Sequence, residues 1–184
     1  IFGEVFISEI FKKPVFDIIR HEKLGLLRDL IVIRSEPLPI VDSLIISRKK
    51  KNYKIPWESI SFFSKDKITS TLSKDMLAEY IESEDDLLVI RDILDKQIVD
   101  VTGAKVVRVN DIKLEGYEGV AMLVAIDAGM RGILRRLGFE KQVLEILRFL
   151  KLELSYNLIS WNYIQPLEKK LKTIALTVPR QMVS

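Results

Sequence analysis

The sequence contains no cysteine, a single histidine and only eight glycines in 184 residues. Without cysteine the chain has no disulfide framework, no thiolate zinc site and no cysteine nucleophile, and a reducing compartment is compatible with it. The one histidine, His21, lies in a polar turn, where a solvated imidazole is not held in place for catalysis. The glycines are scattered and form no phosphate-binding or dinucleotide-binding pattern. We therefore predict that the chain is not an enzyme and has no catalytic residue and no cofactor.

Long apolar runs are also missing. The longest uncharged stretch, Leu154 to Leu167, includes serine, asparagine and proline, and it is shorter than the roughly 20 apolar residues that a membrane helix needs. No signal peptide opens the sequence, so we expect a cytoplasmic protein without a transmembrane segment, for which peripheral membrane association stays open. Because the chain begins at Ile1 and stops at Ser184 without a terminating element, we expect it to be a piece of a longer protein.

The net charge of +3 is small, and it is unevenly distributed along the chain. Residues 1–86 carry 14 basic and 15 acidic side chains, or −1, whereas residues 87–184 carry 15 and 11, or +4. A charge this low does not provide the phosphate-binding surface of a dedicated nucleic-acid protein, so we do not expect a nucleic-acid partner. Any anionic partner is expected to meet the second half.

An internal repeat organises the chain. The segment Ile10–Asp17 resembles Ile93–Asp100, and the only two tryptophans, Trp57 and Trp161, stand in similar contexts near the end of each copy. The other aligned pairs are Lys23–Leu30 with Lys105–Ile112, Ser43–Ile46 with Ala121–Val124, and Ile55–Ile60 with Ile159–Ile164. A duplicated unit of this kind fixes domain boundaries better than composition does.

Each unit is predicted to be rich in β-strands, because runs of Val, Ile, Leu and aromatic residues alternate with turn sequences. The apolar alternation slips around Asn110-Asp111 and around the aligned Arg28-Asp29, which indicates a β-bulge in each copy. Bulges allow a short sheet to curl and close. We therefore predict a mainly β fold of two small barrels in tandem, joined by short helices.

The boundaries follow from the repeat. The first domain is expected at residues 1–71, a connector at 72–86, the second domain at 87–168 and a linker tail at 169–184. The second domain contains an insertion at about 129–152, in which Gly129–Gly138 is typical of a short basic helix that ends at glycine. A further amphipathic helix is expected to lie against the second barrel, on the helical spacing of Phe139, Val143, Leu144, Leu147 and Leu150.

These segments resemble the PRC-barrel family, the small β-barrels shared by the photosynthetic reaction-centre H subunit and the ribosome-maturation factor RimM. The resemblance covers roughly residues 8–64 and 88–168. The stretches Ile93–Asp100, Val107–Asp111, Gly129–Gly138 and Ile159–Trp161 are similar to bacterial proteins in which PRC barrels precede an MgtE-type magnesium-transporter intracellular domain and CBS domains. The resemblance implies interaction and regulation, linked to magnesium in the parent protein, and it brings no catalytic residue.

Four residues are assigned structural roles. Trp57 and Trp161 are expected in the core, with exposure at an interface as the alternative. Asp29 and Asp111 are expected to accept backbone N–H bonds at a bulge or turn rather than to bind metal.

Carboxylates suited to a hard cation are concentrated in the connector, at Glu82, Glu84, Asp85 and Asp86. A solvated acidic linker binds divalent ions only loosely, so we predict no metal site and keep these four residues as weak candidates.

The basic residues Arg131, Arg135 and Arg136 are the candidates for binding a partner. Arg131 and Arg135 share one helical face, and guanidinium groups suit carboxylate or phosphate groups. The alternatives are contact with anionic lipid and salt bridges that hold the second barrel together. The run Arg48–Lys51 is interpreted as a charged hairpin tip, with phosphate contact as the alternative.

We therefore predict a non-catalytic interaction and regulatory module, the N-terminal tandem barrel of a cytoplasmic protein linked to magnesium transport or sensing. Its partner would be another protein or further domains of its own chain, and its oligomeric state stays open. The alternative is an RNA- or ribosome-associated module of the RimM type, which the small positive charge opposes.

Overall fold

The computed structural model describes residues 3–152, 154 and 157–166, so the tail expected at 169–184 lies outside the described residues. The described strands form a 12-stranded and a 3-stranded sheet. The larger sheet contains β1 (Glu4–Phe6), β2 (Pro14–Asp17), β3 (Lys23–Ile33), β4 (Ile40–Arg48), β5 (Lys51–Pro56), β6 (Ile60–Phe63), β7 (Ile68–Ser70), β8 (Ala78–Glu79), β9 (Leu87–Leu88), β12 (Asp111–Tyr117), β13 (Val120–Asp127) and β14 (Leu158–Ser160). The smaller sheet contains β10 (Gln97–Asp100), β11 (Lys105–Arg108) and β15 (Ile164–Pro166).

The helices are short. They are α1 (Ile7–Ile10), α2 (Met130–Arg136) and α3 (Glu140–Phe149), with the 3-10 turns η1 (Trp57–Ser59), η2 (Lys74–Met76) and η4 (Trp161–Tyr163) and the π-helical turn η3 (Val89–Ile93). Within the described part of the chain, no helix combines the length and the apolar character needed to cross a membrane.

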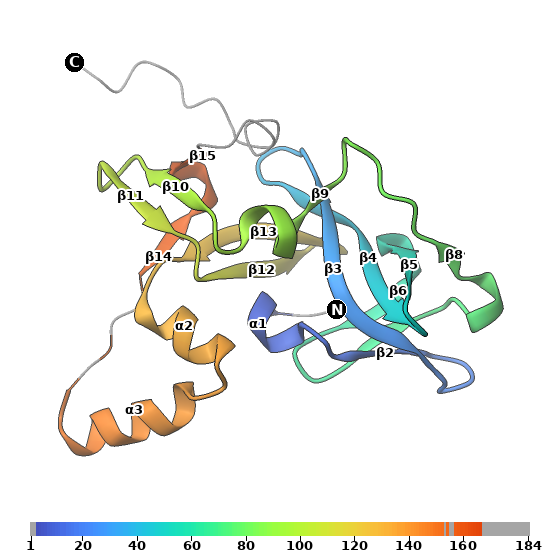
Figure 1. The fold of residues 1–184 in the computed structure, drawn as a ribbon, viewed down its shortest axis with the longest axis horizontal. Helices are drawn as coiled ribbons and strands as arrows, with labels where there is room; N and C mark the ends of the chain where they lie inside the picture. Colours follow the sequence, from blue (N-terminus) through green and yellow to red (C-terminus); the bar gives the residue numbers. More distant parts are fainter. Residues whose placement is uncertain (1–2, 153, 155–156, 167–184) are drawn as a thin grey trace.

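Strands from both repeats belong to one curled sheet, with the strand order β1-β12-β13-β4-β3-β2-β7-β6 (Figure 1). The two halves meet where β13 pairs with β4 at Met122 and Ile40. The ladder between β3 and β4 shifts register between Leu27 and Asp29, which confirms the bulge predicted at Arg28. At the aligned position in the second copy the chain instead leaves the smaller sheet after β11 and enters the larger sheet at β12.

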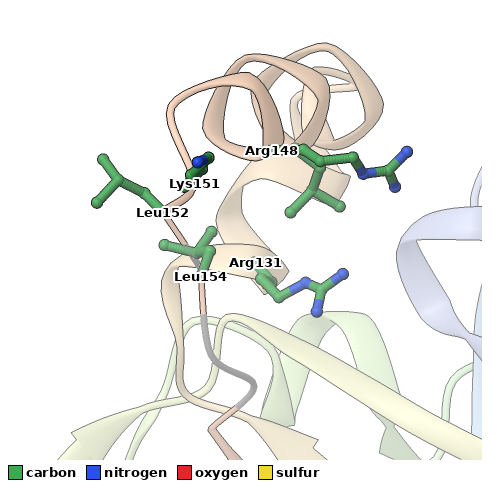
Figure 2. Close-up of a pocket in the computed structure, with 6 residues that line it drawn as sticks. Arg131, Arg148, Lys151, Leu152 and Leu154 are labelled. Atoms are coloured by element: carbon green, nitrogen blue, oxygen red, sulfur yellow. The ribbon is translucent and has the colours of Figure 1, made fainter.

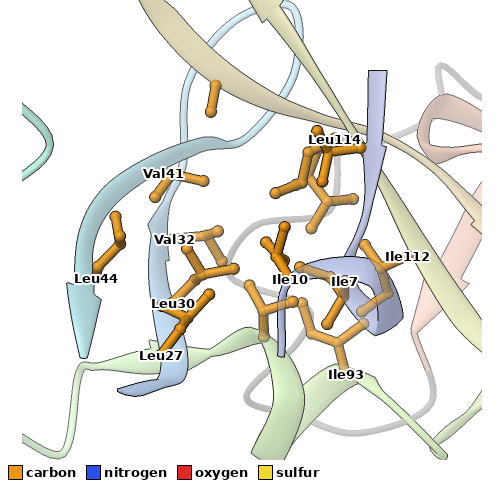
Figure 3. Packing of buried hydrophobic residues seen from close by; sticks show 14 of the residues in the cluster. Ile7, Ile10, Leu27, Leu30, Val32, Val41, Leu44, Ile93, Ile112 and Leu114 are labelled. Carbon is orange, nitrogen blue, oxygen red and sulfur yellow. The ribbon is translucent and has the colours of Figure 1, made fainter. Parts of the chain in front are cut away.

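A hydrophobic core lies inside the curl and draws on both copies (Figure 3). Ile7 and Ile10 of α1 lie within this cluster, together with Leu30 from the first copy and Ile93 and Ile112 from the second. The prediction of a mainly β fold with short helices is confirmed. The finer prediction of two tandem barrels is not, because strands of both copies share one sheet and their buried side chains share one cluster.

The opening segments of the two copies are exchanged. Strand β1 of the first copy pairs with β12 of the second, and β9 of the second pairs with β3 of the first. Each of these strands leads directly into a short helix, α1 or η3, and the residues after the two helices, Lys12 and Asp95, both have positive φ (63° and 67°). The copies therefore interlock through equivalent elements.

The insertion of the second copy contains α2 and α3, which form a helical hairpin at residues 130–152 (Figure 1). We expected the amphipathic helix α3 to lie against the second barrel, but it packs against α2 instead, and no residue of α3 is buried. Val143, Leu144 and Leu147 of the predicted apolar stripe are half-buried, whereas Phe139 and Leu150 at its ends stay exposed.

Candidate functional site

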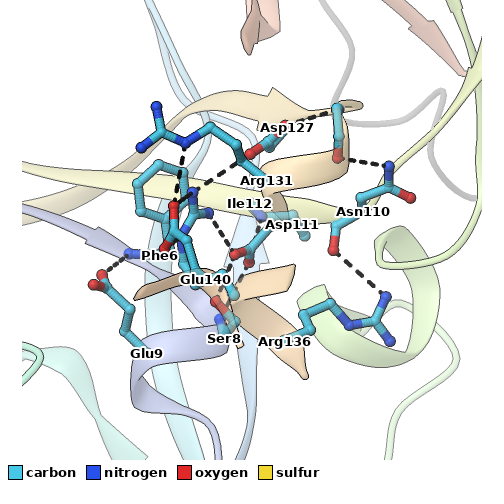
Figure 4. Close-up of polar contacts among 12 residues, drawn as sticks. Phe6, Ser8, Glu9, Asn110, Asp111, Ile112, Asp127, Arg131, Arg136 and Glu140 are labelled. Atoms are coloured by element: carbon cyan, nitrogen blue, oxygen red, sulfur yellow. Dashed lines mark hydrogen bonds and ion pairs between the residues drawn. The ribbon is translucent and has the colours of Figure 1, made fainter. Parts of the chain in front are cut away.

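The polar cluster that holds the helical hairpin on the sheet is the candidate site, because it brings together Asp111 and the three arginines singled out in the sequence (Figure 4). Helix α2 approaches β12 and β13 closely at Gly132, where a Cβ atom would lie 3.1 Å from Asn110 Cβ and 3.1 Å from Asp127 Cγ. Gly138, with φ of 76°, ends α2 and allows the turn into α3. Two glycines thus place the arginines of α2 over the sheet.

Arg135 lies at the centre of this cluster, with a side chain that is only 8% exposed. Its Nη1 donates to Asp111 Oδ2 at 2.8 Å, its Nη2 lies 3.5 Å from Asp127 Oδ2, and its Nε lies 3.3 Å from Glu140 Oε2. The guanidinium carbon is 3.6 Å from the centroid of the Phe6 ring, which is a cation–π contact. Arg135 therefore ties α2 to β12, β13, α3 and the N-terminal segment at once.

Two buried groups of the cluster, Asp127 and Arg135, have shifted pKa values. Burial raises the pKa of Asp127 above its ordinary value, and the nearby Asp111 adds to this, outweighing the Gly129 N–H bond and the attraction of Arg135. Burial alone would lower the pKa of Arg135, but its bond to Asp111 and its proximity to Glu140 outweigh burial and raise that pKa. The cluster is a buried network of one cation and several carboxyl groups, and removal of the cation leaves the buried Asp111 and Asp127 without a positively charged partner.

The two structural aspartates cap helices of the opposite copy. Asp29 accepts the backbone N–H groups of Ile90 (2.8 Å) and Arg91 (3.1 Å) at the start of η3. Asp111 accepts the backbone N–H of Ser8 in α1 at 3.1 Å, and the Ser8 hydroxyl at 2.5 Å. Carboxylates are favoured at such helix starts, where backbone N–H groups lack partners. Burial nevertheless raises the pKa of Asp29 overall, because these N–H bonds do not offset desolvation completely.

The other two candidate arginines are also engaged. Arg131 Nε lies 3.3 Å from Glu140 Oε1. Arg136 makes a bidentate contact with Asp95, at 2.8 and 2.9 Å, and its guanidinium lowers the pKa of that carboxyl. Arg108 binds the same carboxylate at 3.0 Å. The arrangement matches the alternative in which the arginines stabilise the fold with the chain's own acidic residues, and it leaves Arg135 no solvent-facing position from which to bind a partner.

The two tryptophans occupy equivalent places, each as the first residue of a 3-10 turn, but their surroundings differ. Trp161 is buried, 3% exposed, and its Nε1 has no hydrogen-bond partner among the described residues. Trp57 is half-buried, meets the edge of Phe63, and its Nε1 donates to the Gly119 carbonyl at 2.8 Å in the turn between β12 and β13. Both rings pack against the shared core cluster, and Trp57 also joins the two copies.

The weak metal candidates of the connector are spread apart. Glu82 pairs with Arg91, and Asp86 accepts the Tyr80 hydroxyl at 2.9 Å, while Glu84 and Asp85 are exposed. In the described ranges, no group of three or more histidine, aspartate or glutamate side chains is placed to hold a metal ion.

Sequence reasoning missed Asp127, Glu140, Phe6 and Ser8 as members of the cluster. Asp127 is distinguished only in the strand ladders, where it faces Asp111, whereas the residue that faces Asp29 is Ile45; the sequence alignment of the repeats instead pairs Ile45 with Leu123. A carboxylate at a position that is apolar in the first copy indicates a specific partner nearby. Phe6 and Ser8 carry no such signal, because they reach the cluster only through the exchange of β1 and α1.

Chemically, the cluster anchors the hairpin rather than presenting reactive groups. The opposite side of the hairpin shows the reverse character, because Phe139, Ile146, Phe149 and Leu150 are each more than half exposed. In comparisons with known protein families and with curated proteins, no family model and no curated protein matches the chain.

Proposed function

We propose that this chain is a non-catalytic docking and regulatory module of the tandem PRC-barrel type, belonging to a cytoplasmic protein linked to magnesium transport or sensing. The repeat supports the proposal, since equivalent aspartates, turns and tryptophans recur in both copies. On this proposal each copy derives from one small barrel, and the exchange of β1 and β9 joins the two into a rigid platform.

The observation that carries the docking role is the set of large apolar side chains that the helical hairpin leaves exposed. Arg135 is 8% exposed in the cluster against the sheet, whereas Ile146 is 60% and Phe149 is 86% exposed. A surface helix whose only task is to cover a core keeps its large apolar side chains on the covered side. Contiguous exposed apolar side chains are typical of interaction surfaces.

The test replaces apolar side chains of this outer side. In I146S/F149S we expect the free energy of unfolding to change by less than about 0.5 kcal/mol, because exposed positions contribute little to stability. Binding of a hydrophobic fluorescent dye should fall at the same time. The matched control is I112S, whose side chain is fully buried, and which should lose several kcal/mol, roughly 3 or more.

If I146S/F149S unfolds as readily as I112S, the outer side is part of the core and the docking proposal is wrong. Binding of RNA at about 50 mM salt that weakens steeply as salt is added would instead favour the RimM-like alternative.

A further inference from the structure

The outer side of the helical hairpin carries an apolar surface with positive charge around it. We define the outer face as Leu137, Phe139, Ile146, Phe149, Leu150 and Leu152, each more than half exposed. Phe139, Ile146 and Leu150 lie along one side of α3 at helical spacing. Helix α3 is at the edge of the molecule, beyond α2 as seen from the sheet (Figure 1). The face is thus open to a large flat partner.

The charge of the hairpin is strongly positive. Residues 130–152 contain six basic and two acidic side chains, a net charge of +4. The arginines of α2 are bound to carboxylates, but Lys141, Arg148 and Lys151 have no ion-pair partner among the described residues. The positive charge available to a partner therefore lies on and just after α3, beside the outer face.

A pocket of about 450 Å³ lies next to these cations (Figure 2). It is lined by Arg131, Arg148 and Lys151 together with Leu144, Leu152 and Leu154. Figure 2 shows the side chains of Arg131 and Arg148 pointing to the same side of the pocket, with Leu154 on the chain that follows α3. Cations beside leucines match a ligand that carries a negative headgroup and an apolar chain.

Charge decides between the candidate occupants of the outer face. A second copy of the chain would bring +4 against +4, and residues 167–184, with four basic and one acidic side chain, carry the same sign. Both are opposed by repulsion, whereas an anionic partner is attracted. Among anionic partners, a bilayer suits the combination of a helix lying at the surface, an apolar face that includes phenylalanine, and neighbouring cations that form no ion pair with the described residues.

We propose that the helical hairpin binds the surface of an anionic phospholipid bilayer. The outer face enters the boundary between headgroups and acyl chains, and Arg148 and Lys151 contact lipid phosphate and carboxylate groups. The proposal rests on the docking role proposed above and names the partner of the same surface. It requires no change of fold, because Arg135 already holds the hairpin on the sheet.

The experiment measures co-sedimentation of the whole chain with vesicles of phosphatidylcholine alone and of an equimolar mixture with phosphatidylserine. We expect binding to the mixed vesicles and little to the neutral ones, and weaker binding when salt shortens the electrostatic range from about 10 Å to about 3 Å. I146S/F149S should bind about tenfold more weakly for each apolar side chain lost. R148E/K151E should bind about fivefold more weakly, or worse, for each cation lost.

Matched controls carry the same changes elsewhere. I19S/I81S removes two exposed isoleucines outside the hairpin, and K49E/K50E reverses two exposed lysines at the tip between β4 and β5. Both control variants should bind the mixed vesicles clearly more tightly than I146S/F149S and R148E/K151E do. If K49E/K50E weakens binding as much as R148E/K151E does, the attraction is diffuse and the proposed site is wrong.

Three further results would overturn the proposal: no binding to either kind of vesicle, a concentration-dependent dimer that I146S/F149S abolishes, or competition by poly-glutamate strong enough to indicate an acidic protein as the partner. In each of these cases a stable I146S/F149S variant with reduced dye binding still supports a docking module. Loss of folding in that variant would instead remove the proposed function itself.

Discussion

Removing the cation from the buried cluster should destabilise the whole fold. In R135M the methionine keeps much of the side-chain volume, but Asp111 and Asp127, both 0% exposed, lose their positive partner. Breaking one side of a buried ion pair costs about 3–5 kcal/mol, because the remaining charge is left without compensation. This is a large share of the roughly 5–15 kcal/mol that stabilises a typical domain. Urea unfolding followed by circular dichroism measures the difference.

The stability lost in R135M should depend on pH. The pKa of Asp127 is already raised in the folded state, and loss of Arg135 raises it further, so its ionised form opposes folding more strongly than before. The destabilisation caused by ionised Asp127 is complete above the pKa of this residue in the folded state. It declines as the pH falls from that pKa towards the lower pKa of the unfolded chain. The gap in stability between R135M and the unchanged chain should therefore be smaller near pH 4, roughly the ordinary pKa of aspartate, than near pH 7.

Two variants make this prediction refutable. R136M removes one of the two arginine partners of Asp95, whose side chain is 40% exposed, and a surface pair of this kind contributes about 0–1 kcal/mol. D127N/R135M removes one of the stranded carboxylates and should recover part of the stability lost in R135M. If R135M costs no more than R136M at neutral pH, Arg135 does not anchor the hairpin, and the reasoning about the cluster fails.

Three other changes test separate parts of the structure. D29A should cost about 1–2 kcal/mol, as for loss of a helix cap, and hydrogen exchange should accelerate at the Ile90 and Arg91 amides, whereas D66A at an exposed site should not have these effects. G132A should destabilise by about 1–3 kcal/mol in thermal or urea unfolding, despite the better helix propensity of alanine, because the new Cβ meets Asn110 and Asp127 at about 3.1 Å. G3A, which meets no atom within 4 Å, is its control. In tryptophan fluorescence, W57F should show the blue-shifted emission of the buried Trp161, whereas W161F should show the red-shifted emission of the half-buried Trp57. Identical spectra of the two variants would contradict the different environments of the two tryptophans.

The sequence was sufficient for features that depend on local pattern. The repeat, the strand-rich composition and the bulge at Arg28 are all encoded within a few neighbouring residues, and the short helix after Gly129 follows from its glycines and arginines. The alternative role of the arginines, salt bridges within the fold, could also be stated in advance from residue type. These are the levels at which side-chain periodicity and turn chemistry determine structure.

Partners that are distant along the chain could not be predicted in the same way. Asp111 binds Ser8 across 103 residues, and Asp29 binds Ile90 across 61. An aspartate at a predicted bulge or turn is expected to accept N–H bonds, but the sequence does not say whether the N–H groups belong to its own copy or to the other one. The prediction that α3 lies against the second barrel was wrong for a related reason. An amphipathic pattern shows that a helix has an apolar side, but it does not show what covers that side.

The difference between the two copies explains why only the second one needs the hairpin. In the first copy, Asp29 faces Ile45 across the ladder, and its carboxylate accepts hydrogen bonds from backbone N–H groups. In the second copy, Asp111 faces Asp127, so two buried carboxylates lie together and require a cation. The inserted hairpin supplies that cation as Arg135. Because Arg135 holds the hairpin through charge, the exposed apolar residues Ile146, Phe149 and Leu150 are not needed to attach it to the described fold, which is the condition that a docking surface needs.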